Sequence, residues 1–420
     1  MIPEKLKEKI GYLYFKVSYY FQKYFSKKCN LLIIDNFTPD IGFVGFRVEE
    51  INFFLKNINN CLLLTMSKKF FNVRLREKLF YFPAWNYIIT RRRFYFQRNK
   101  YCNYFNIDKK KIFFYGGDKF KVNGAYCLFL FNAFISLDFF EKNKIPFVFT
   151  LLPGGYFAFN NHFSDFMLKK IFSSSMFRGV FVTQKIIYKY ILSKGYSKNK
   201  IYYSYGGGFC VEDFVLNKKF YKKDKNTFDI CFVGFRYSIG GKDKGFDIVC
   251  DVAKKIIPEH PFVHFHFVGN NTLTDFLPNK YDNIIKNLHF YGIQGSSFFN
   301  NFYTKMDIAL SPNRPNILMK GMVDGFPCQA ESMKYGTALF VTDPLNSNDT
   351  YTNGTDIVII NNKINDIVDN ILFYINNLEL LYKLSENGRK TFFRYFNREH
   401  QEKDRIFFIE KYLGIKLDKK

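Results

Sequence analysis

Residues 229–253, DICFVGFRYSIGGKDKGFDIVCDVA, place two cations beside a glycine-containing loop. A buried strand is expected to run into this loop, and a helix is expected to follow it. A strand, a flexible loop and a helix N-terminus together form an anion site. Gly240 and Gly241 let the backbone approach a ligand closely, while Arg236 and Lys244 supply the charge that a departing diphosphate needs. The pattern favours a nucleotide leaving group; the alternative is a plain α/β loop with exposed basic residues.

Two carboxylates stand in a second stretch, residues 311–343, SPNRPNILMKGMVDGFPCQAESMKYGTALFVTD. Asp324 and Glu331 are separated by a turn-forming Gly-Phe-Pro, and Glu331 opens a predicted helix that ends at Gly336. A carboxylate at a helix start after such a turn can accept hydrogen bonds from ribose hydroxyls, and a second one can hold sugar hydroxyls. Lone acidic residues are usually solvated, so the interpretation depends on the neighbouring cations and turn.

The elements that would position these residues form two α/β series. Short apolar runs alternate with helical stretches from residue 31 to Gly208, and the alternation restarts at Asp229 after a polar, lysine-rich stretch. Strands alternating with helices predict a parallel sheet covered on both faces. A chain of 420 residues also exceeds the size of one hydrophobic core. We expect two Rossmann-like domains at 30–208 and 228–385, a linker at 209–227, a basic amphipathic helix at 1–29, and C-terminal helices at 386–420 that pack back on the first domain.

The chain is basic, with a formal net charge of +25. The helix at 1–29 could lie on an anionic membrane or pack its apolar stripe on the domain behind it. Residues 90–101, TRRRFYFQRNKY, form the strongest basic and aromatic cluster. It could bind RNA by stacking and phosphate contacts, dock on lipid headgroups, or be a solvated helix face.

The eight cysteines include no CxxC pair and several lie within apolar runs, so we predict reduced core residues rather than disulfides or a zinc site. No run of about 18 uncharged apolar residues occurs, and the N-terminus lacks a signal-peptide pattern. We expect a cytoplasmic protein, peripheral at the inner face of the plasma membrane if the basic helix binds lipid. The six histidines are scattered, and His264 and His266 share one face of a predicted strand, where a structural role is expected.

The segments FVGFRYSIGGKDKGFDI, FHFVGNN, HFYG, SPN and DGFPCQAESMKYGTALFVTD occur in an order and spacing that resemble the nucleotide-sugar domain of retaining GT-B glycosyltransferases of family 4 (glycosyl transferases group 1). The resemblance covers residues 228–400, and the first half only by topology and short pieces. It implies two Rossmann-like domains facing across a cleft, the second holding a nucleotide-sugar donor and the first an acceptor.

By this resemblance, Arg236 and Lys244 would hold the donor diphosphate, Asp324 would contact the transferred sugar, and Glu331 would hold the ribose. The sequence departs from the family pattern in two places. Six residues instead of seven separate Asp324 from Glu331, and Arg236 stands eight residues before Lys244, so that Lys242 could share the task. The backbone neighbours of the donor would be Gly325, Phe326 and Pro327, and the loop at Gly292 and Ile293 would border the base.

In the first half, LLIIDNFTPDIGFVGFRVEEI resembles the family's first strand and its glycine loop facing the donor, with Gly42 and Gly45 as candidates. The loop IPFVFTLLPGGYF stands where many members carry a His, which is absent here. Pro153, Gly154 and Gly155 would line the cleft. No D-x-D triplet of the kind that holds a metal-bound diphosphate was found, so we expect no metal and no cofactor besides the nucleotide-sugar co-substrate.

The resemblance implies an enzyme, a hexosyltransferase that retains anomeric configuration and extends a glycan or lipid-linked glycan in surface polysaccharide biosynthesis. Two alternatives stay open. A nucleotide-sugar epimerase or a glycan phosphorylase can share the fold, and a nucleic-acid-binding protein would explain the basic charge. The expected partners are a nucleotide-sugar, the acceptor and an anionic membrane surface, rather than nucleic acid.

Overall fold

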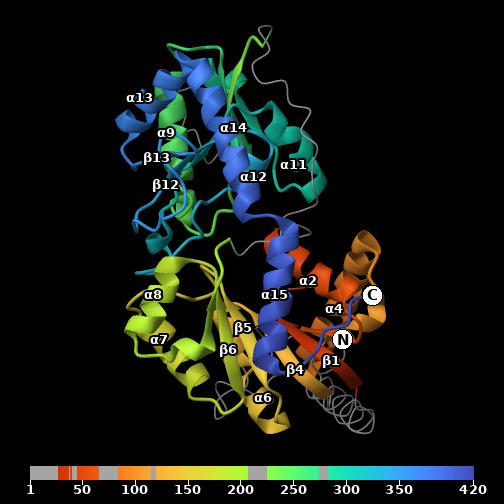
Figure 1. Cartoon of the computed structure of the whole chain (residues 1–420). Helices are drawn as coiled ribbons and strands as arrows, with labels where there is room; N and C mark the ends of the chain where they lie inside the picture. The colour runs from red at the N-terminus through yellow and green to blue at the C-terminus, as the bar shows by residue number, and fades with distance from the viewer. Residues whose placement is uncertain are drawn as a thin grey trace.

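The computed structural model describes residues 27–36, 38–39, 45–65, 84–114, 120–206, 225–273 and 282–420. These residues form two parallel α/β domains, one above the other in Figure 1. The chain has the two-sheet architecture predicted from its alternating apolar runs. Residues 1–26 of the basic helix predicted at 1–29 and most of the linker predicted at 209–227 lie outside the described residues. Residues 27–29 are not helical as predicted but begin the first strand, because they pair with the neighbouring strand of the sheet. None of the described helices combines the length and apolar character needed to cross a bilayer.

The first domain is built on a seven-stranded parallel sheet with the order β3-β2-β1-β4-β5-β6-β7. Each strand is a short apolar run, and β5 is buried at every position, as expected for a sheet covered on both faces. The strands are β1 (Lys27–Asp35), β2 (Cys61–Thr65), β3 (Ile112–Phe114), β4 (Phe120–Leu128), β5 (Phe147–Leu151), β6 (Phe177–Val182) and β7 (Ile201–Tyr203).

Helices cover both faces of this sheet and form a hydrophobic core on each. One core includes side chains of α5 (Leu130–Ile135), α6 (Leu137–Asn143), α7 (His162–Phe172) and α8 (Lys185–Ser193). The opposite core includes side chains of α2 (Phe46–Asn57), α4 (Ala84–Phe105) and α15 (Arg398–Leu413). The basic and aromatic cluster at 90–101 lies in α4, where Phe94 is buried while Tyr95 and Phe96 are exposed beneath Arg98 and Lys100.

The second domain is built on a six-stranded parallel sheet with the order β10-β9-β8-β11-β12-β13. Its strands are β8 (Phe228–Val233), β9 (Val263–Val268), β10 (Leu288–Phe290), β11 (Ile308–Ser311), β12 (Ala338–Thr342) and β13 (Val358–Ile360). One face packs against α9 (Phe246–Ile256) and α13 (Ile364–Ile375). The other packs against α11 (Ser296–Phe302) and α12 (Glu331–Lys334). Short 3-10 helices cover Lys109–Lys111, Lys198–Lys200, Ile239–Gly241, Asp282–Asn287, Tyr303–Lys305 and Pro315–Ile317.

The last two helices join the domains. Helix α14 (Leu378–Tyr395) packs on the second domain, and α15 then runs along the first sheet (Figure 1). The return therefore begins at Arg398, later than the predicted boundary at 386, because Phe392 still belongs to a core of the second domain. The chain passes between the domains after β7 and again between α14 and α15. Gln401 connects these two segments, because its Nε2 donates to the carbonyls of Tyr205 and Tyr395, at 2.9 Å each.

Helix α15 is joined to α2 by a buried ion pair. Arg405 and Glu50 are both fully buried, with 3.1 Å between Nε and Oε1. The guanidinium also lies 3.6 Å from the centre of the Phe181 ring. Two glycines make room for the helix, because a Cβ at Gly124 or Gly179 would lie within 2.5 Å of a side chain of α15. Sheet and helix therefore fit closely.

Candidate active site

The two domains meet where loops following the carboxyl ends of their strands touch. The loop after β5 contacts the loop after β11, since Phe159 N donates to Gly321 O at 2.7 Å and Ala158 pairs with Met322 in an isolated bridge. Tyr205 Oη donates to Phe326 O at 3.0 Å. Carboxyl ends of parallel strands are the usual location of ligand sites in open α/β sheets. The candidate site is therefore the junction between the domains.

Lys244 and Asp324 are brought together at this junction, with 2.9 Å between Nζ and Oδ2. Both side chains are mostly buried, at 22% and 18% exposure. Burial is the largest single influence and alone would lower the pKa of Lys244, but the charge and hydrogen bond of Asp324, together with Cys328 and Asp243, outweigh it and the pKa is raised. Lys244 is thus a firmly protonated cation next to a carboxylate, in the region where a diphosphate and a sugar were predicted to bind.

A buried carboxylate shapes the loop that carries Lys244. Oδ1 of Asp243 accepts hydrogen bonds from the backbone N and Oγ of Ser238, at 2.9 and 2.5 Å. Gly245, the residue after Lys244, has φ +77°, and a Cβ there would lie 2.2 Å from Pro312 O. Only glycine combines that backbone angle with that close approach. The loop is therefore packed against the segment after β11 and positions Lys244.

Arg236 and Lys242 stand on the same loop. The backbone N of Arg236 donates to Asn270 Oδ1 at 2.7 Å, and the side chain is half-buried. Lys242 is exposed, and its carbonyl accepts a hydrogen bond from Arg314 Nε at 3.0 Å. The loop after β8 therefore carries three cations, of which Lys244 is the one that contacts Asp324.

The Gly-Phe-Pro turn after Asp324 faces the first domain. Gly325 is exposed, and a Cβ there would lie 4.0 Å from Pro153 Cγ and from Gln184 Nε2. The peptide between Phe326 and Pro327 is cis, and Phe326 is buried. This turn lies between Asp324 and Glu331 and forms a wall of the junction.

Cys328 follows the turn, and its Sγ donates to Gly325 O at 2.8 Å. Burial raises the pKa of the thiol to about 12, although the charge of Lys244 opposes the shift. The thiol therefore stays protonated and holds the turn in place.

Glu331 begins α12 and reaches solvent at the junction. Protein surrounds the carboxylate closely enough that lost hydration raises its pKa, and the negative charge of Glu49 on α2 adds to the effect, while Lys334 opposes it. Glu49 belongs to the first domain, so two carboxylates from different domains influence each other here. Sequence reasoning missed Glu49, because nothing in the sequence relates the first turn of α2 to α12.

Four glycines of the first half were predicted to face the donor or to line the cleft. Gly45, with φ +103°, is the N-cap of α2, whereas Gly42 lies outside the described residues. A Cβ at Gly154 would lie 4.0 Å from Met322 Cε across the junction. A Cβ at Gly155, where φ is +56°, would lie 2.6 Å from the Phe129 ring. Pro153, Gly154 and Gly155 thus line the junction.

Gly292 and Ile293 lie in the loop after β10. Gly269 N, in the loop after β9, donates to Gly292 O at 2.9 Å, and a Cβ at Gly269 would lie 2.1 Å from Gly234 O in the loop after β8. Ile293 is 68% exposed. The loops after β8, β9 and β10 are therefore adjacent.

Residues 216–391 match the sequence family Glycosyl transferases group 1. This part of the chain is a glycosyltransferase group 1 domain. No curated protein matches the chain significantly.

Solved structures share the fold of the whole chain. HepE of Anabaena in complex with UDP aligns with a TM-score of 0.60 and 11% identity, over 91% of this chain and 99% of HepE. Sucrose-phosphate synthase of Thermosynechococcus elongatus aligns with a TM-score of 0.56 and 12% identity, over 90% and 99% of the two chains. TarM of S. aureus gives 0.52 and 16%, over 68% of this chain and 54% of TarM, so the chain spans about half the length of TarM. The fold is GT-B.

A buried ion pair on the first-domain side was not predicted from the sequence. Asp35, at the end of β1, is fully buried, and it accepts hydrogen bonds from Arg47 Nε at 2.7 Å and from Thr38 N at 2.7 Å. Arg47 lies in the first turn of α2, next to Gly45, and its guanidinium is 4.9 Å from the Phe129 ring centre. The signal for this pair in the sequence was Asp35 itself, an aspartate at the end of an apolar run. The pair fixes the start of α2 opposite the group 1 domain.

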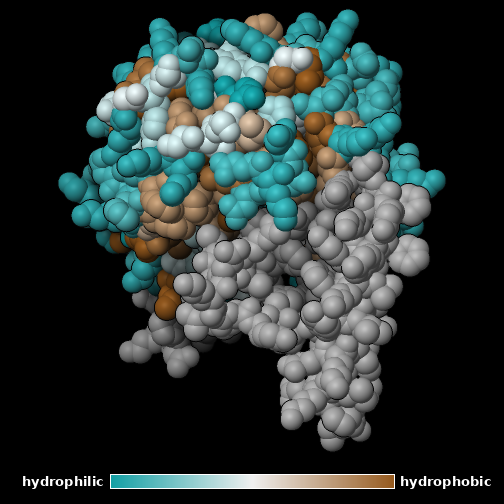
Figure 2. Space-filling model, turned by 90° about the horizontal axis from the view of Figure 1, so that it is seen from below, coloured by the Kyte–Doolittle hydropathy of each residue, from teal (hydrophilic) through white to brown (hydrophobic). Residues whose placement is uncertain are grey.

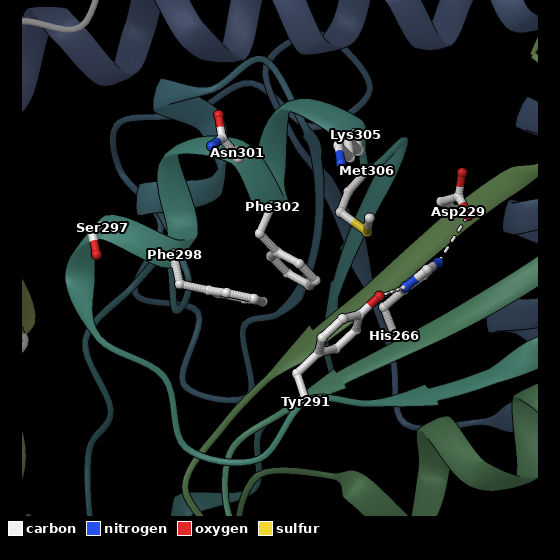
Figure 3. Close-up of a pocket in the computed structure, with 9 residues that line it drawn as sticks. All are labelled: Asp229, His266, Tyr291, Ser297, Phe298, Asn301, Phe302, Lys305 and Met306. Carbon is white, nitrogen blue, oxygen red and sulfur yellow. Dashed lines mark hydrogen bonds and ion pairs between the residues drawn. The ribbon is translucent and has the colours of Figure 1, made fainter.

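The group 1 domain also has a pocket of about 320 Å³ between its sheet and α11 (Figure 3). His266 connects Asp229 at 2.8 Å with Tyr291 at 2.9 Å, and the rings of Tyr291, Phe298 and Phe302 converge on the opening. Burial would raise the pKa of Asp229, but His266 and Lys225 more than offset it and hold that pKa below its usual range.

The predicted shared strand face of His264 and His266 is present in this network. His264 Nδ1 lies 2.9 Å from His289 Nε2, and the His289 ring stacks on both other imidazoles. The hydrogen bonds of these histidines join them to one another, to Tyr291 and to Asp229, whereas Lys244 and Asp324 pair with each other. Among those residues no group of three or more His, Cys, Asp or Glu side chains could hold a metal ion.

Proposed function

We propose that the protein transfers a hexose-type sugar from a nucleotide-diphosphate donor to a hydroxyl of a glycan or lipid-linked glycan, with retention of anomeric configuration. The observation that carries this proposal is the pair of Lys244 and Asp324 at the carboxyl edge of a glycosyltransferase group 1 domain. The UDP complex of HepE, which shares the fold, supports a nucleotide-sugar donor. The proposed setting is surface polysaccharide biosynthesis in the cytoplasm, at the inner face of the plasma membrane.

The proposed mechanism begins with charge compensation. Lys244 and Arg236, assisted by Lys242, would neutralise the negative charge that develops on the diphosphate as the glycosidic bond opens. No metal is required in this proposal, because the loop after β8 provides that charge. Once Lys244 binds phosphate oxygens, the Asp324 carboxylate is released to accept hydrogen bonds from the sugar hydroxyls.

The remaining donor contacts follow from position. Glu331, exposed at the junction, would accept the ribose hydroxyls. Gly325 would bring its backbone close to the sugar, since it carries no Cβ. The base would rest on the loop at Gly292 and Ile293. Gly45 would face the donor from the first domain.

Calorimetric titration with UDP, GDP, ADP and their glucose conjugates tests the proposal. We expect one nucleotide to bind, and both Lys244→Ala and Glu331→Ala to weaken it at least tenfold. Lys254→Ala is a matched control, because Lys254 pairs with Asp251 at 3.2 Å away from the junction. Glu379→Ala, in the first turn of α14, is the control for Glu331.

Absence of binding by every nucleotide, in a folded sample, would refute the proposal. Product analysis separates the chemistries that share the fold. Transfer to an added acceptor supports the transferase, whereas an epimerised donor or a sugar 1-phosphate would identify an epimerase or a phosphorylase. Salt-sensitive RNA or DNA binding that persists in Glu331→Ala would instead favour a nucleic-acid-binding protein.

A further inference from the structure

A narrow group of aromatic rings runs from the domain junction onto the outside of the first domain. We call it the aromatic seam and define it as Phe131 and Phe134 of α5, Tyr156 of the loop after β5, and Phe163 and Phe166 of α7. Successive ring centres are 4.6 Å (Phe131–Tyr156), 6.4 Å (Tyr156–Phe163), 6.3 Å (Phe163–Phe134) and 5.9 Å (Phe134–Phe166) apart. The rings come from three elements, α5, the loop after β5 and α7, and each ring contacts the next.

The seam is unusually exposed for such apolar groups. Tyr156, Phe163 and Phe166 are 42%, 43% and 41% exposed, although aromatic side chains normally contribute most to stability when they are buried. Figure 2 shows one face of the first domain. The described surface there is largely hydrophilic, and its hydrophobic residues gather in patches. A contiguous exposed apolar patch rimmed by polar residues marks an interaction site.

The inner end of the seam lies at the junction. Tyr156 directly follows Gly154 and Gly155, which line it, and Gly155 packs against Phe129. The Phe129 ring centre is 6.2 Å from that of Phe46, the residue after Gly45. Both Tyr156 and Phe129 have positive φ, 68° and 71°, a conformation that is costly for bulky residues and typical of functional sites. A ligand on the seam would therefore reach the place where we propose the sugar is transferred.

The seam is bordered by groups that can bind hydroxyls. Asn160 and His162 are exposed beside Tyr156 and Phe163. Asp165, on the side of α7 that faces α8, accepts a hydrogen bond from Tyr190 Oη at 2.6 Å and pairs with Lys194 at 2.9 Å. Apolar ring faces flanked by amide and imidazole groups match a pyranose, which has C–H faces and hydroxyl edges.

From this arrangement we propose that the aromatic seam binds the saccharide chain of the acceptor, with its sugar rings stacked on Tyr156, Phe163 and Phe166. This inference rests on the proposed function and names the acceptor as an extended glycan. A membrane surface is the less fitting occupant, because the seam is narrow and its inner end lies at the junction. Lys169 and Lys170, the cations beside the seam, stand at its outer end next to Phe166.

Binding of four linear hexasaccharides, an α-glucan, a β-glucan, a mannan and an N-acetylglucosamine oligomer, tests this proposal by calorimetry. We expect the native protein to bind at least one of them. Because a single aromatic contact contributes about 0.5–1.5 kcal/mol, Phe163→Ser and Phe166→Ser should each weaken binding about fivefold. The double substitution should weaken it by about 20-fold or more, while Phe163→Tyr should retain it.

Phe373→Ser is the matched control, because Phe373 is 51% exposed on α13 of the second domain. It should leave hexasaccharide binding unchanged. Nucleotide binding, measured in the same samples, should be unchanged in every seam variant. If nucleotide binding is absent from the native protein, the proposed function fails independently of the seam.

Two results would overturn the seam proposal. One is that no hexasaccharide binds, or that the double variant binds as tightly as the native protein. The other concerns vesicles of 70% phosphatidylcholine and 30% phosphatidylglycerol. If the native protein co-sediments with these vesicles and the double variant Phe163→Ser/Phe166→Ser does not, the seam is a membrane contact and not a glycan site.

Discussion

Lys244 and Asp324 form an ion pair, 2.9 Å from Nζ to Oδ2, across two loops that follow different strands of the second sheet. Each was predicted from the sequence to contact a different part of the donor. In the unliganded chain they neutralise each other, so the cation does not repel Arg236 and the carboxylate does not repel an incoming diphosphate. Donor binding must exchange this pair for two new sets of contacts.

The exchange makes Asp324→Asn informative. Removing the carboxylate charge leaves Lys244 without the interaction that raises its pKa, but it also removes the competitor for that cation. We expect nucleotide affinity to be equal or greater, while sugar transfer falls at least 100-fold. Calorimetry with the free nucleotide and turnover assays separate the two effects. Asp251→Asn, at the remote pair with Lys254, should change neither, and a large loss of nucleotide affinity in Asp324→Asn would contradict this interpretation.

The influence of Glu49 on Glu331 predicts a pH dependence. Burial and the Glu49 charge raise the pKa of Glu331, so its carboxylate takes up a proton at a higher pH than an ordinary glutamate. If ionised Glu331 accepts the ribose hydroxyls, nucleotide affinity should fall as pH is lowered through this raised pKa. Glu49→Gln should move the loss to lower pH. Titrations of the nucleotide between pH 4.5 and 8 measure this shift, and an unchanged midpoint in Glu49→Gln would contradict it.

The histidine network predicts acid sensitivity of the second domain. Burial lowers the pKa of both His264 and His289, and neighbouring imidazoles add to the effect. The folded state therefore binds fewer protons than the unfolded chain, so stability is fully present above the unfolded pKa of about 6.5 and falls as pH decreases. Thermal unfolding between pH 7.5 and 5 should show this loss, reduced in His289→Gln. His400→Gln, at an exposed position of α15, should keep the pH dependence of the native chain.

Gly245 and Gly354 form a matched pair for a test of the loop after β8. Both have φ +77°, but a Cβ at Gly245 would lie 2.2 Å from Pro312 O, whereas no atom lies within 4 Å at Gly354. Gly354→Ala should cost about 1–2 kcal/mol of unfolding free energy from the backbone alone. Gly245→Ala adds a backbone clash and should cost more, with nucleotide affinity also lost. Denaturant unfolding and calorimetry check both, and equal costs would show that the loop can shift freely.

The sequence predicted the sheets well, because buried parallel strands appear as short apolar runs between helical stretches. It also singled out Arg236, Lys244, Asp324 and Glu331 as candidate site residues, since they stand beside glycines and turns. It could not show that Lys244 and Asp324 touch, because they are 80 positions apart and meet only through the strand order. Interactions between the domains, such as the influence of the Glu49 charge on Glu331, depend on packing that leaves no local pattern.

The chain passes between the domains at two places, after β7 and between α14 and α15, and Gln401 joins the carbonyls of Tyr205 and Tyr395 beside both. Two adjacent crossings form a hinge with one axis. They permit rotation of the domains about the line that joins the crossings and resist rotation about other axes. If the junction opens to admit the proposed donor, we expect the opening to be restricted to one direction, so that closing would bring Lys244 and Asp324 back to the same alignment with the first domain.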